Sequence, residues 1–436
     1  MRNDLSAFWL PFTPNRSFKA DPRILVRAEG MYFYDESGRA LLDACAGLWC
    51  VNAGHGRKTI ADAIAKAARE LDFAPTFQFA HPAAFALAQR IAALAPDGMD
   101  HVFFVNSGSE ACDTALKIAR AYFQKVGQGG RYRLIGRDKG YHGTTFAGIS
   151  VGGLANNRKP YGPLLPGTDD HLPLPYDATL RFTRGEPEGG AQYAQALERI
   201  VALHGAETIA AVIVEPFAGS AGVYAPPKDY LKTLRAICDR HGILLIFDEV
   251  ITGFGRLGHA FAAERYGVTP DIITFAKGVS NGAVPMGGAV VSNKIHDAFM
   301  TGPDHQIELV HGHTYSAHPL ACAAALATLD LYRDEDMFAR AKKLEPVLEE
   351  AVHGLKGAPF VADIRNVGLA AGIELEPDLQ APGRRGLEAI KRAFADENLV
   401  IRVGGDTIAL SPPLIVSEAE IGRIVEGVRN VLTRLS

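Results

Sequence analysis

The sequence predicts an α/β protein with a mainly parallel central sheet and a smaller α+β part built from both ends of the chain. Six short apolar runs, rich in β-branched residues, lie between residues 101 and 293, and helical patterns alternate with many of them. These runs are continuously apolar, which indicates strands that are covered on both faces. The last hundred residues instead combine long helical patterns with short strands.

The central elements follow from apolar runs and from helical periodicity. The expected strands are 101–107, 132–137, 210–216, 243–249, 271–278 and 287–293. The expected helices between them are 109–125, 191–204, 228–241 and 258–267. A long loop rich in Pro and Gly is expected over 156–190.

The C-terminal part shows three helical patterns, at 318–333, 337–355 and 385–397. A hairpin of 399–403 and 407–411 around the turn 404–406 comes next. The last helix begins with a capping box from Ser417 to Glu420. A second hairpin is expected in 31–43. We therefore expect a large domain over 56–320 and a small domain from 1–55 and 321–436.

Composition and charge exclude several classes of protein. The 436 residues are 47% hydrophobic and 22% charged, which is typical of globular proteins rather than disordered ones. The net charge of −4 argues against a nucleic-acid partner. The five cysteines include no CxxC pair, so neither a disulfide framework nor a structural metal site is expected. No run of 18 apolar residues and no apolar signal core is present, and we expect a cytoplasmic protein without membrane contact.

Three strand ends carry candidate functional groups. Ser107, Gly108 and Ser109 follow a strand and open a helix, where backbone N–H groups can bind a phosphate; a simple capped turn is the alternative. Asp248 ends the apolar run 243–249 and could hold a positive group, or form a loop salt bridge. Lys277 follows the next run and could form a Schiff base if desolvated, or lie on the surface.

Together the three candidates are far more specific than any one alone. A phosphate cradle, an acid for a ring nitrogen and a Schiff-base lysine describe a pyridoxal phosphate site. The stretch 253–258, GFGRLG, matches G-x-G-x-x-G literally and keeps a nicotinamide oxidoreductase open as a distant alternative. Five residues separate it from the strand, however, and Asp271 begins its strand rather than ending it.

Other side chains give weaker signals. The histidines at 305, 311, 313 and 318 lack the spacing of a metal site, and no metal is expected. Trp49, in a glycine-flanked segment, could be a core residue or line a pocket. Arg402 could be a solvated edge residue.

The chain resembles the class III aminotransferases of pyridoxal phosphate fold type I. The matching stretches are SGSEA (107–111), YHG (141–143), IVEP (213–216), FDEVITGFGRLG (247–258), TFAKGVSNG (274–282) and HTYSAHPLACAAALA (313–327). Within the family, WLPFTPNR (9–16), GLWC (47–50) and IRVGGDTI (401–408) are most similar to the ω-amino acid–pyruvate group, which includes β-alanine–pyruvate aminotransferases.

The resemblance implies a sheet of seven strands and a role for each matching residue. Lys277 would carry the cofactor and move protons, and Asp248 would pair with the ring nitrogen. The resemblance further implies cofactor contacts by Ser107, Gly108, Ser109, Tyr141, His142, Glu215 and Val250, with Thr314 reaching the phosphate of the other subunit. It implies a substrate pocket shaped by Trp49, Tyr141 and Phe77 of the partner, and an Arg402 that pairs with carboxylates. The enzyme would be a homodimer, with a tetramer also open.

The activity implied is ping-pong transamination of an ω-amino acid or primary amine with pyruvate. A class III enzyme that uses 2-oxoglutarate with ornithine, acetylornithine or 4-aminobutyrate is the alternative. Two residues depart from the pattern: Ala409 stands where β-alanine relatives tend to carry Gln, and His313 stands where many amine transaminases have an aromatic residue.

Overall fold

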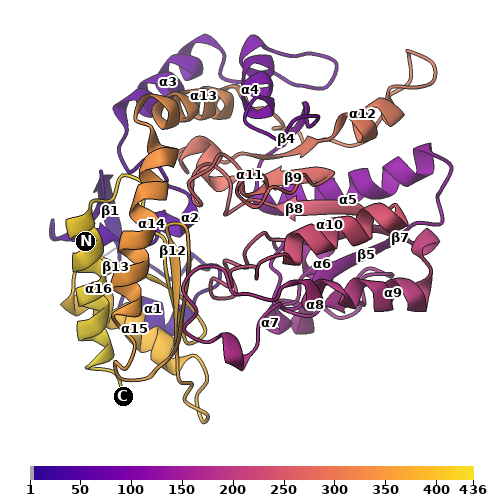
Figure 1. The fold of residues 1–436 in the computed structure, drawn as a ribbon. Coiled ribbons are helices and arrows are strands. Elements are labelled where there is room, and N and C mark those ends of the chain that lie inside the picture. The colour runs from indigo at the N-terminus through magenta and orange to yellow at the C-terminus, as the bar shows by residue number, and fades with distance from the viewer. Residues whose placement is uncertain (1–3) are drawn as a thin grey trace.

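The computed structural model describes residues 4–436 and is organised around a seven-stranded sheet (Figure 1). The strand order is β4-β10-β9-β8-β7-β5-β6, and β10 alone runs antiparallel to its neighbours. This confirms the mainly parallel α/β sheet. The strands are β4 (His101–Val105), β5 (Arg133–Arg137), β6 (His171–Leu172), β7 (Ile209–Val214), β8 (Leu244–Asp248), β9 (Ile272–Phe275) and β10 (Gly287–Val291).

Helices cover both faces of this sheet, which explains why its strands read as continuous apolar runs. Every residue of β7, β8, β9 and β10 is buried. Two helices pack on one face, α5 (Gly108–Lys125) and α12 (Asn293–Phe299). The other face is covered by α8 (Ala191–Ala194), α9 (Ala196–His204) and α10 (Tyr230–His241).

Three expected elements differ in detail. The helix expected over 191–204 is divided between α8 and α9 at Gln195. The helix expected over 258–267 is reduced to α11 (Ala262–Tyr266), because the chain before it turns through left-handed Gly255 and Gly258. The expected loop 156–190 contributes β6, a strand of two residues that is too short to leave a pattern. It also holds α7 (Ala155–Arg158), η1 (Lys159–Tyr161) and η2 (Ala178–Leu180).

The N-terminal and C-terminal segments share a second, four-stranded sheet of order β1-β2-β3-β13. Leu399 and Val400 pair in parallel with Leu42 and Asp43, so strands from the two ends of the chain lie side by side. The antiparallel pairing of β2 with β3 is the hairpin expected in 31–43. The strands are β1 (Leu25–Glu29), β2 (Tyr32–Asp35), β3 (Ala40–Asp43) and β13 (Leu399–Val400).

A third sheet has the order β11-β12-β15-β14 and is entirely antiparallel. Its β14–β15 hairpin turns at Gly405 and Asp406, within the predicted turn 404–406. The single strand expected over 399–403 is wrong: Leu399 and Val400 pair with β3 in the second sheet, and only 402–404 pair with β15, because the chain passes from one sheet to the other at Ile401. The strands are β11 (Val361–Val367), β12 (Ala370–Leu375), β14 (Arg402–Gly404) and β15 (Thr407–Leu410). Helices α14 (Met337–His353), α15 (Arg384–Asp396) and α16 (Glu418–Leu432) belong to the same part of the molecule.

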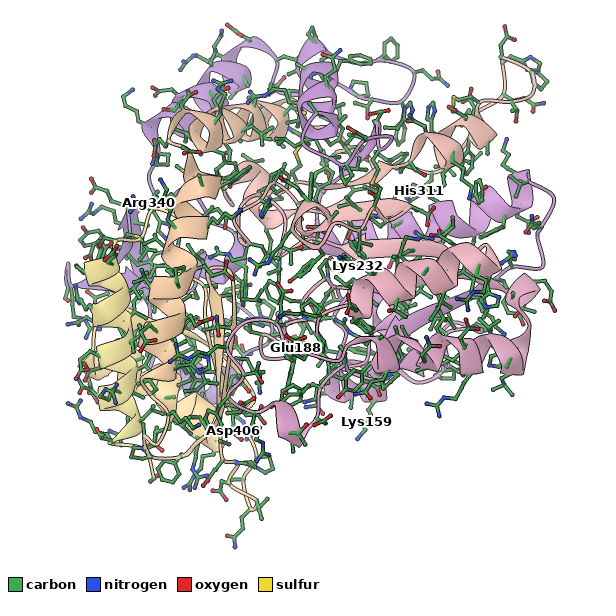
Figure 2. All side chains as sticks on the ribbon, viewed as in Figure 1. Lys159, Glu188, Lys232, His311, Arg340 and Asp406 are labelled. Atoms are coloured by element: carbon green, nitrogen blue, oxygen red, sulfur yellow. The ribbon has the colours of Figure 1, made fainter. Side chains whose placement is uncertain are left out.

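Side chains fix these helices in place. Ser417 and Glu420 form the predicted capping box of α16. Arg340, labelled on α14 in Figure 2, donates hydrogen bonds to the carbonyl oxygens of Leu414, Ile415 and Val416, which directly precede α16. The proposed domain boundary at 320/321 falls inside α13 (Pro319–Asp334), which packs on α3 (Lys58–Glu70) and α4 (Pro82–Ala92). The division at 55/56 and 320/321 stays a prediction.

The remaining elements are short or lie at the edges of the sheets. They are α1 (Asn15–Ala20), α2 (Ala46–Trp49), α3 (Lys58–Glu70), α4 (Pro82–Ala92), α6 (Phe146–Val151), η3 (Ala206–Thr208) and η4 (Lys277–Ser280). Within residues 4–436, the longest and most apolar helices still fall short of what a bilayer crossing requires.

Candidate active site

A cavity lies where the carboxyl ends of the parallel strands meet. Ligands of open α/β sheets bind at this edge. Loops after β4, β5, β7, β8 and β9 all reach it. The lining residues are Gly108, Ser109, Cys112, Tyr141, His142, Gly143, Glu215, Phe217, Asp248, Val250, Ile251 and Lys277.

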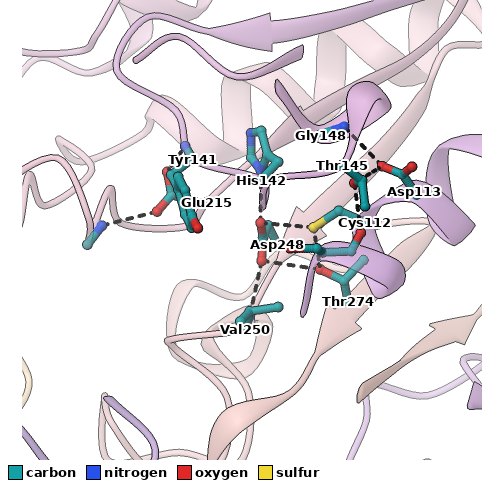
Figure 3. A network of polar contacts seen from close by, with 12 residues as sticks. Cys112, Asp113, Tyr141, His142, Thr145, Gly148, Glu215, Asp248, Val250 and Thr274 are labelled. Carbon is teal, nitrogen blue, oxygen red and sulfur yellow. Dashed lines mark hydrogen bonds and ion pairs between the residues drawn. The ribbon is translucent and has the colours of Figure 1, made fainter. Parts of the chain in front are cut away.

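Asp248 is the most firmly held side chain of the cavity (Figure 3). His142 Nδ1 lies 2.8 Å from its Oδ2, and the Cys112 thiol donates to the same oxygen at 3.2 Å. The Thr274 hydroxyl and the Val250 N–H donate to Oδ1 at 3.2 and 3.1 Å. Burial alone would raise the pKa of Asp248, but the His142 hydrogen bond and charge and the Cys112 hydrogen bond outweigh it. The pKa therefore lies below its usual range, and the carboxylate stays ionised.

Asp248 and Glu249 point to opposite faces, as expected for neighbours at a strand end. Glu249 is fully buried away from the cavity, where its carboxylate accepts the N–H groups of Ala262 and Ala263 at the start of α11. Burial raises the pKa of Glu249 to about 7. The two adjacent acids thus have different environments and different protonation.

Lys277 begins η4 directly after β9 and has a left-handed backbone, with φ of 48°. A non-glycine residue in this region is strained, and such strain is common at functional sites. Among residues 4–436 the Nζ atom has no hydrogen-bond partner. Burial lowers the pKa of Lys277, so more of its amine is neutral than in water.

The N-terminus of α5 supplies an anion cradle. Ser107 is its N-cap: Oγ accepts the Glu110 N–H at 3.1 Å, and the side chain faces the helix rather than lining the cavity. Gly108 and Ser109 line the cavity, and within residues 4–436 their N–H groups have no acceptor. A Cβ on Gly143 would lie 2.6 Å from Ser109 Cα, so only glycine permits this close approach. The helix start therefore presents free N–H groups to the cavity, which is what the predicted phosphate cradle requires.

Tyr141, Glu215 and Val250 complete the cavity walls. The Tyr141 N–H donates to Glu215 Oε1 at 2.9 Å, and the Gly219 N–H donates to Oε2 at 3.2 Å. Burial raises the pKa of both Glu215 and Tyr141. A Cβ on Gly108 would lie 2.8 Å from Val250 Cγ1, so glycine leaves room for this valine.

Trp49 and Arg402 are not lining residues of this cavity. The Trp49 ring is buried and tilted against Phe217, with 6.2 Å between ring centroids. Arg402 is half-buried on β14, and its charge acts on the pKa of Lys277 and of Tyr141. Its guanidinium has no hydrogen bond or ion pair to any residue of the described range 4–436. A cation without an acid is suited to a carboxylate ligand.

Phe77 and Thr314 lie outside this cavity. Phe77 is 57% exposed, and Thr314 is exposed too. A Cβ on Gly312 would lie 2.8 Å from the Phe77 ring, so the segments that carry the two residues are neighbours on the surface. Neither residue belongs to the cavity of its own chain, and their roles in the site of another subunit stay a prediction.

Four lining residues of the cavity were not among the predicted site residues: Cys112, Gly143, Phe217 and Ile251. Cys112 lies three positions after Ser109 on α5, and this helical spacing could have revealed it. Phe217 lies two positions after Glu215 and contacts Trp49, but only the fold brings these two rings together. The GFGRLG stretch does not open a helix. Its Arg256 is fully buried and donates to the carbonyl oxygens of Leu369 and Pro412 and to Asn52.

The residues present fit pyridoxal phosphate by their chemistry. An ionised buried carboxylate suits a pyridinium nitrogen, a desolvated amine suits an aldehyde, and free N–H groups at a helix start suit a phosphate. The buried Nε2 atom of His142 and Nε1 atom of Trp49 have no hydrogen-bond partner within residues 4–436, so both remain available to hydrogen-bond a ligand or a water molecule.

Comparisons with known proteins agree with this chemistry. The family model of the class-III aminotransferases matches residues 15–432. An omega-aminotransferase of Caulobacter vibrioides is 59% identical over 99% of this chain and 98% of its own length. A beta-alanine–pyruvate aminotransferase of Pseudomonas aeruginosa is 47% identical over 99% and 97%. The crystal structure of an amine transaminase from an uncultivated Pseudomonas species, in its PLP-bound form, superposes with a TM-score of 0.91 at 36% identity and covers both chains completely.

Proposed function

Because the chain belongs to the class-III aminotransferases, we propose that it transfers the amino group of an ω-amino acid or primary amine to pyruvate, with pyridoxal phosphate as cofactor. One observation carries this proposal: Lys277, Asp248 and the start of α5 line one cavity. The activities for which the Caulobacter and Pseudomonas relatives are named support the choice of amine donor and of pyruvate.

Asp248, Lys277 and the α5 start would hold the cofactor. When bound, pyridoxal phosphate supplies a ring that draws electrons from the carbon that loses a proton. Asp248 would hold the positive ring nitrogen, and its four hydrogen-bond donors fix both carboxylate oxygens. Gly108 and Ser109 would bind the phosphate through their free N–H groups. Tyr141 and Val250 would flank the ring.

Lys277 is the proposed acid and base. Burial lowers the pKa of Lys277, so more of its amine is neutral than in water, and its cavity position gives Nζ access to the carbon that bears the substrate nitrogen. Within each half-reaction Nζ would take a proton from one carbon and deliver it to another: away from the carbon that bears the substrate nitrogen in the first, and to that carbon in the second. Asp248 keeps the neighbouring charge constant throughout.

Arg402 would select the acceptor. Its guanidinium can pair with the pyruvate carboxylate, and can turn away when an uncharged amine substituent occupies the same space. The half-buried position makes this pair stronger than a surface ion pair. Ala409, which pairs with Arg402 across the β14–β15 hairpin, adds no polar group beside it.

The exposed positions of Phe77 and Thr314 support a homodimer in which each subunit completes the other's substrate pocket. Further large apolar side chains are exposed near Phe77 and Thr314, as expected for a surface that a second copy covers. They are Phe73, Phe79, Phe85, Ile307, Val310 and Tyr315.

The visible absorption spectrum tests the proposal. We expect a yellow band from the bound cofactor, bleached by an amine and restored by pyruvate. Recovery only with 2-oxoglutarate would replace the acceptor and keep the family. Absence of any band after addition of pyridoxal phosphate would refute the proposal.

A further inference from the structure

The segment that carries Trp49 has an unusual backbone. Ala46, Gly47 and Trp49 all have left-handed conformations, with φ of 46°, 65° and 63°. A non-glycine residue in this region is strained, and such a conformation persists only where its surroundings hold it. The element α2 is accordingly kinked at Gly47 and Leu48. The orientation of the Trp49 ring therefore depends on what holds residues 45–50.

The Asp43 carboxylate holds this segment at two points. Asp43 is fully buried, and its Oδ1 accepts the Cys45 N–H at 2.9 Å while Oδ2 accepts the Gly47 N–H at 2.7 Å. His55 Nε2 lies 2.8 Å from the same Oδ2. The His55 ring packs on Phe33 with centroids 4.2 Å apart, so the third partner is itself anchored. A carboxylate suits this place because both of its oxygens accept.

Asp43 also adjoins the strand that leads to Arg402. Val400 pairs with Asp43, and the Ala44 N–H donates to the Val400 carbonyl oxygen at 2.9 Å. Arg402 follows two residues later. Asp43 therefore lies beside both chain segments that lead to the substrate side, the one that carries Trp49 and the one that carries Arg402. Trp49 itself packs on Phe217, which lines the cavity.

We infer that Asp43 is a positioning residue that fixes the Trp49 ring against Phe217, which lines the cavity, and thereby sets which amines the enzyme accepts. The part of this inference that concerns amine selectivity rests on the proposed function. The part that concerns how Asp43 holds Trp49 does not. Asp43 does not line the cavity and contacts no reacting atom. It acts through the backbone of residues 45–50.

Tryptophan fluorescence tests the geometry without any turnover. The chain has two tryptophans: Trp9 is 87% exposed, whereas Trp49 is 2% exposed. In a Trp9→Phe background the emission reports Trp49 alone. Asp43→Asn replaces one acceptor oxygen by a donor, so one of the held N–H groups loses its partner. We expect emission at longer wavelength and stronger acrylamide quenching in Asp43→Asn, and a larger change in Asp43→Ala.

Amine selectivity tests the consequence. We expect the ratio of kcat/KM for 1-phenylethylamine to that for sec-butylamine to change by at least about fivefold, because the wall that the larger amine meets is no longer fixed. Both amines lack a carboxylate, so Arg402 does not enter the comparison. The cofactor absorption band should stay unchanged.

Asp35→Asn is the matched control. Asp35 Oδ1 also accepts two loop N–H groups, from Ser37 and Arg39, but in the turn between β2 and β3, with no hydrogen bond to residues 45–50. Equal changes in the Asp35 and Asp43 variants would refute the inference. An unchanged kcat/KM ratio or an unchanged Trp49 emission in Asp43→Asn would also refute it. If Asp43→Ala fails to fold, the Asp43→Asn variant alone decides the test. A Trp9→Phe parent that transaminates no amine refutes the proposed function, while the emission change still decides whether Asp43 holds Trp49.

Discussion

The two sides of the cavity are built in opposite ways. On the cofactor side, Asp248 accepts four hydrogen bonds from four different residues. On the substrate side, the Arg402 guanidinium has no partner among residues 4–436, and Trp49 is held through its backbone rather than through its indole N–H. The difference separates two tasks: a saturated carboxylate keeps one charge in one place, whereas an unpaired cation can meet substrates of different shape.

Replacing Lys277 would break this comparison most severely, since Lys277 lies between the two sides. In Lys277→Ala the proton acceptor is lost, and we expect kcat to fall by at least about 10³-fold with every amine. Steady-state rates with 1-phenylethylamine and pyruvate measure the effect. Lys139→Ala is the control, because Lys139 Nζ donates to the Tyr224 hydroxyl and does not line the cavity. Near-normal turnover in Lys277→Ala would refute the role of Lys277.

Asp248→Asn tests the cofactor side. The amide cannot supply the negative charge, so we expect kcat/KM to fall by about 10²–10³-fold, to the same degree for all amines. Asp113→Asn is the control: Asp113 accepts hydrogen bonds from Thr145 and Gly148 near the same cavity but does not line it (Figure 3). Equal losses in both variants would mean that Asp248 acts only through packing.

Arg402→Ala tests the substrate side. We expect kcat/KM for pyruvate to fall by about 10- to 100-fold, because a charge-assisted pair is lost. The half-reaction with 1-phenylethylamine, followed by bleaching in single-turnover experiments, should change less than threefold. An equal loss in both half-reactions would remove the distinction between the two sides.

Glu249→Gln has the smallest expected effect, and it acts on stability. The pKa of Glu249 is raised from 4.5 to about 7 by burial, so the folded protein holds this proton more tightly than the unfolded chain. The free energy of unfolding of the wild type should therefore fall as pH rises from about 4.5 to 7, by about 1–3 kcal/mol relative to Glu249→Gln. Urea unfolding at pH 5 and pH 7.5 measures the difference. Parallel pH profiles would contradict it.

Much of the large sheet could be predicted because burial on both faces leaves continuous apolar runs, as in β7 and β8. Local turn geometry was harder: α11 starts four residues later than expected because left-handed Gly255 and Gly258 continue the turn. The groups at strand ends, Asp248 and Lys277, could be found because parallel strands deliver their carboxyl ends to one edge.

Contacts that depend on distant strand register could not be predicted. In the sequence Asp43 only ends an ordinary strand. Its positioning role depends on the contact with His55 and on the pairing with Val400, over 350 positions away. The same holds for the contact of Trp49 with Phe217. Such pairs have no local periodicity, so only the folded chain shows them.

The parallel pairing of β3 with β13 has a consequence for synthesis on the ribosome. Residues 42 and 43 receive their partners only after residues 399 and 400 have been made. At bacterial-type elongation speeds of roughly 5–20 residues per second, the interval is roughly 20–70 s. Throughout it, one edge of the N-terminal hairpin carries unpaired backbone groups and is open to contact with other nascent chains. When residues 399 and 400 emerge, they pair with this edge. Only then can the segment that carries Trp49 take its final position.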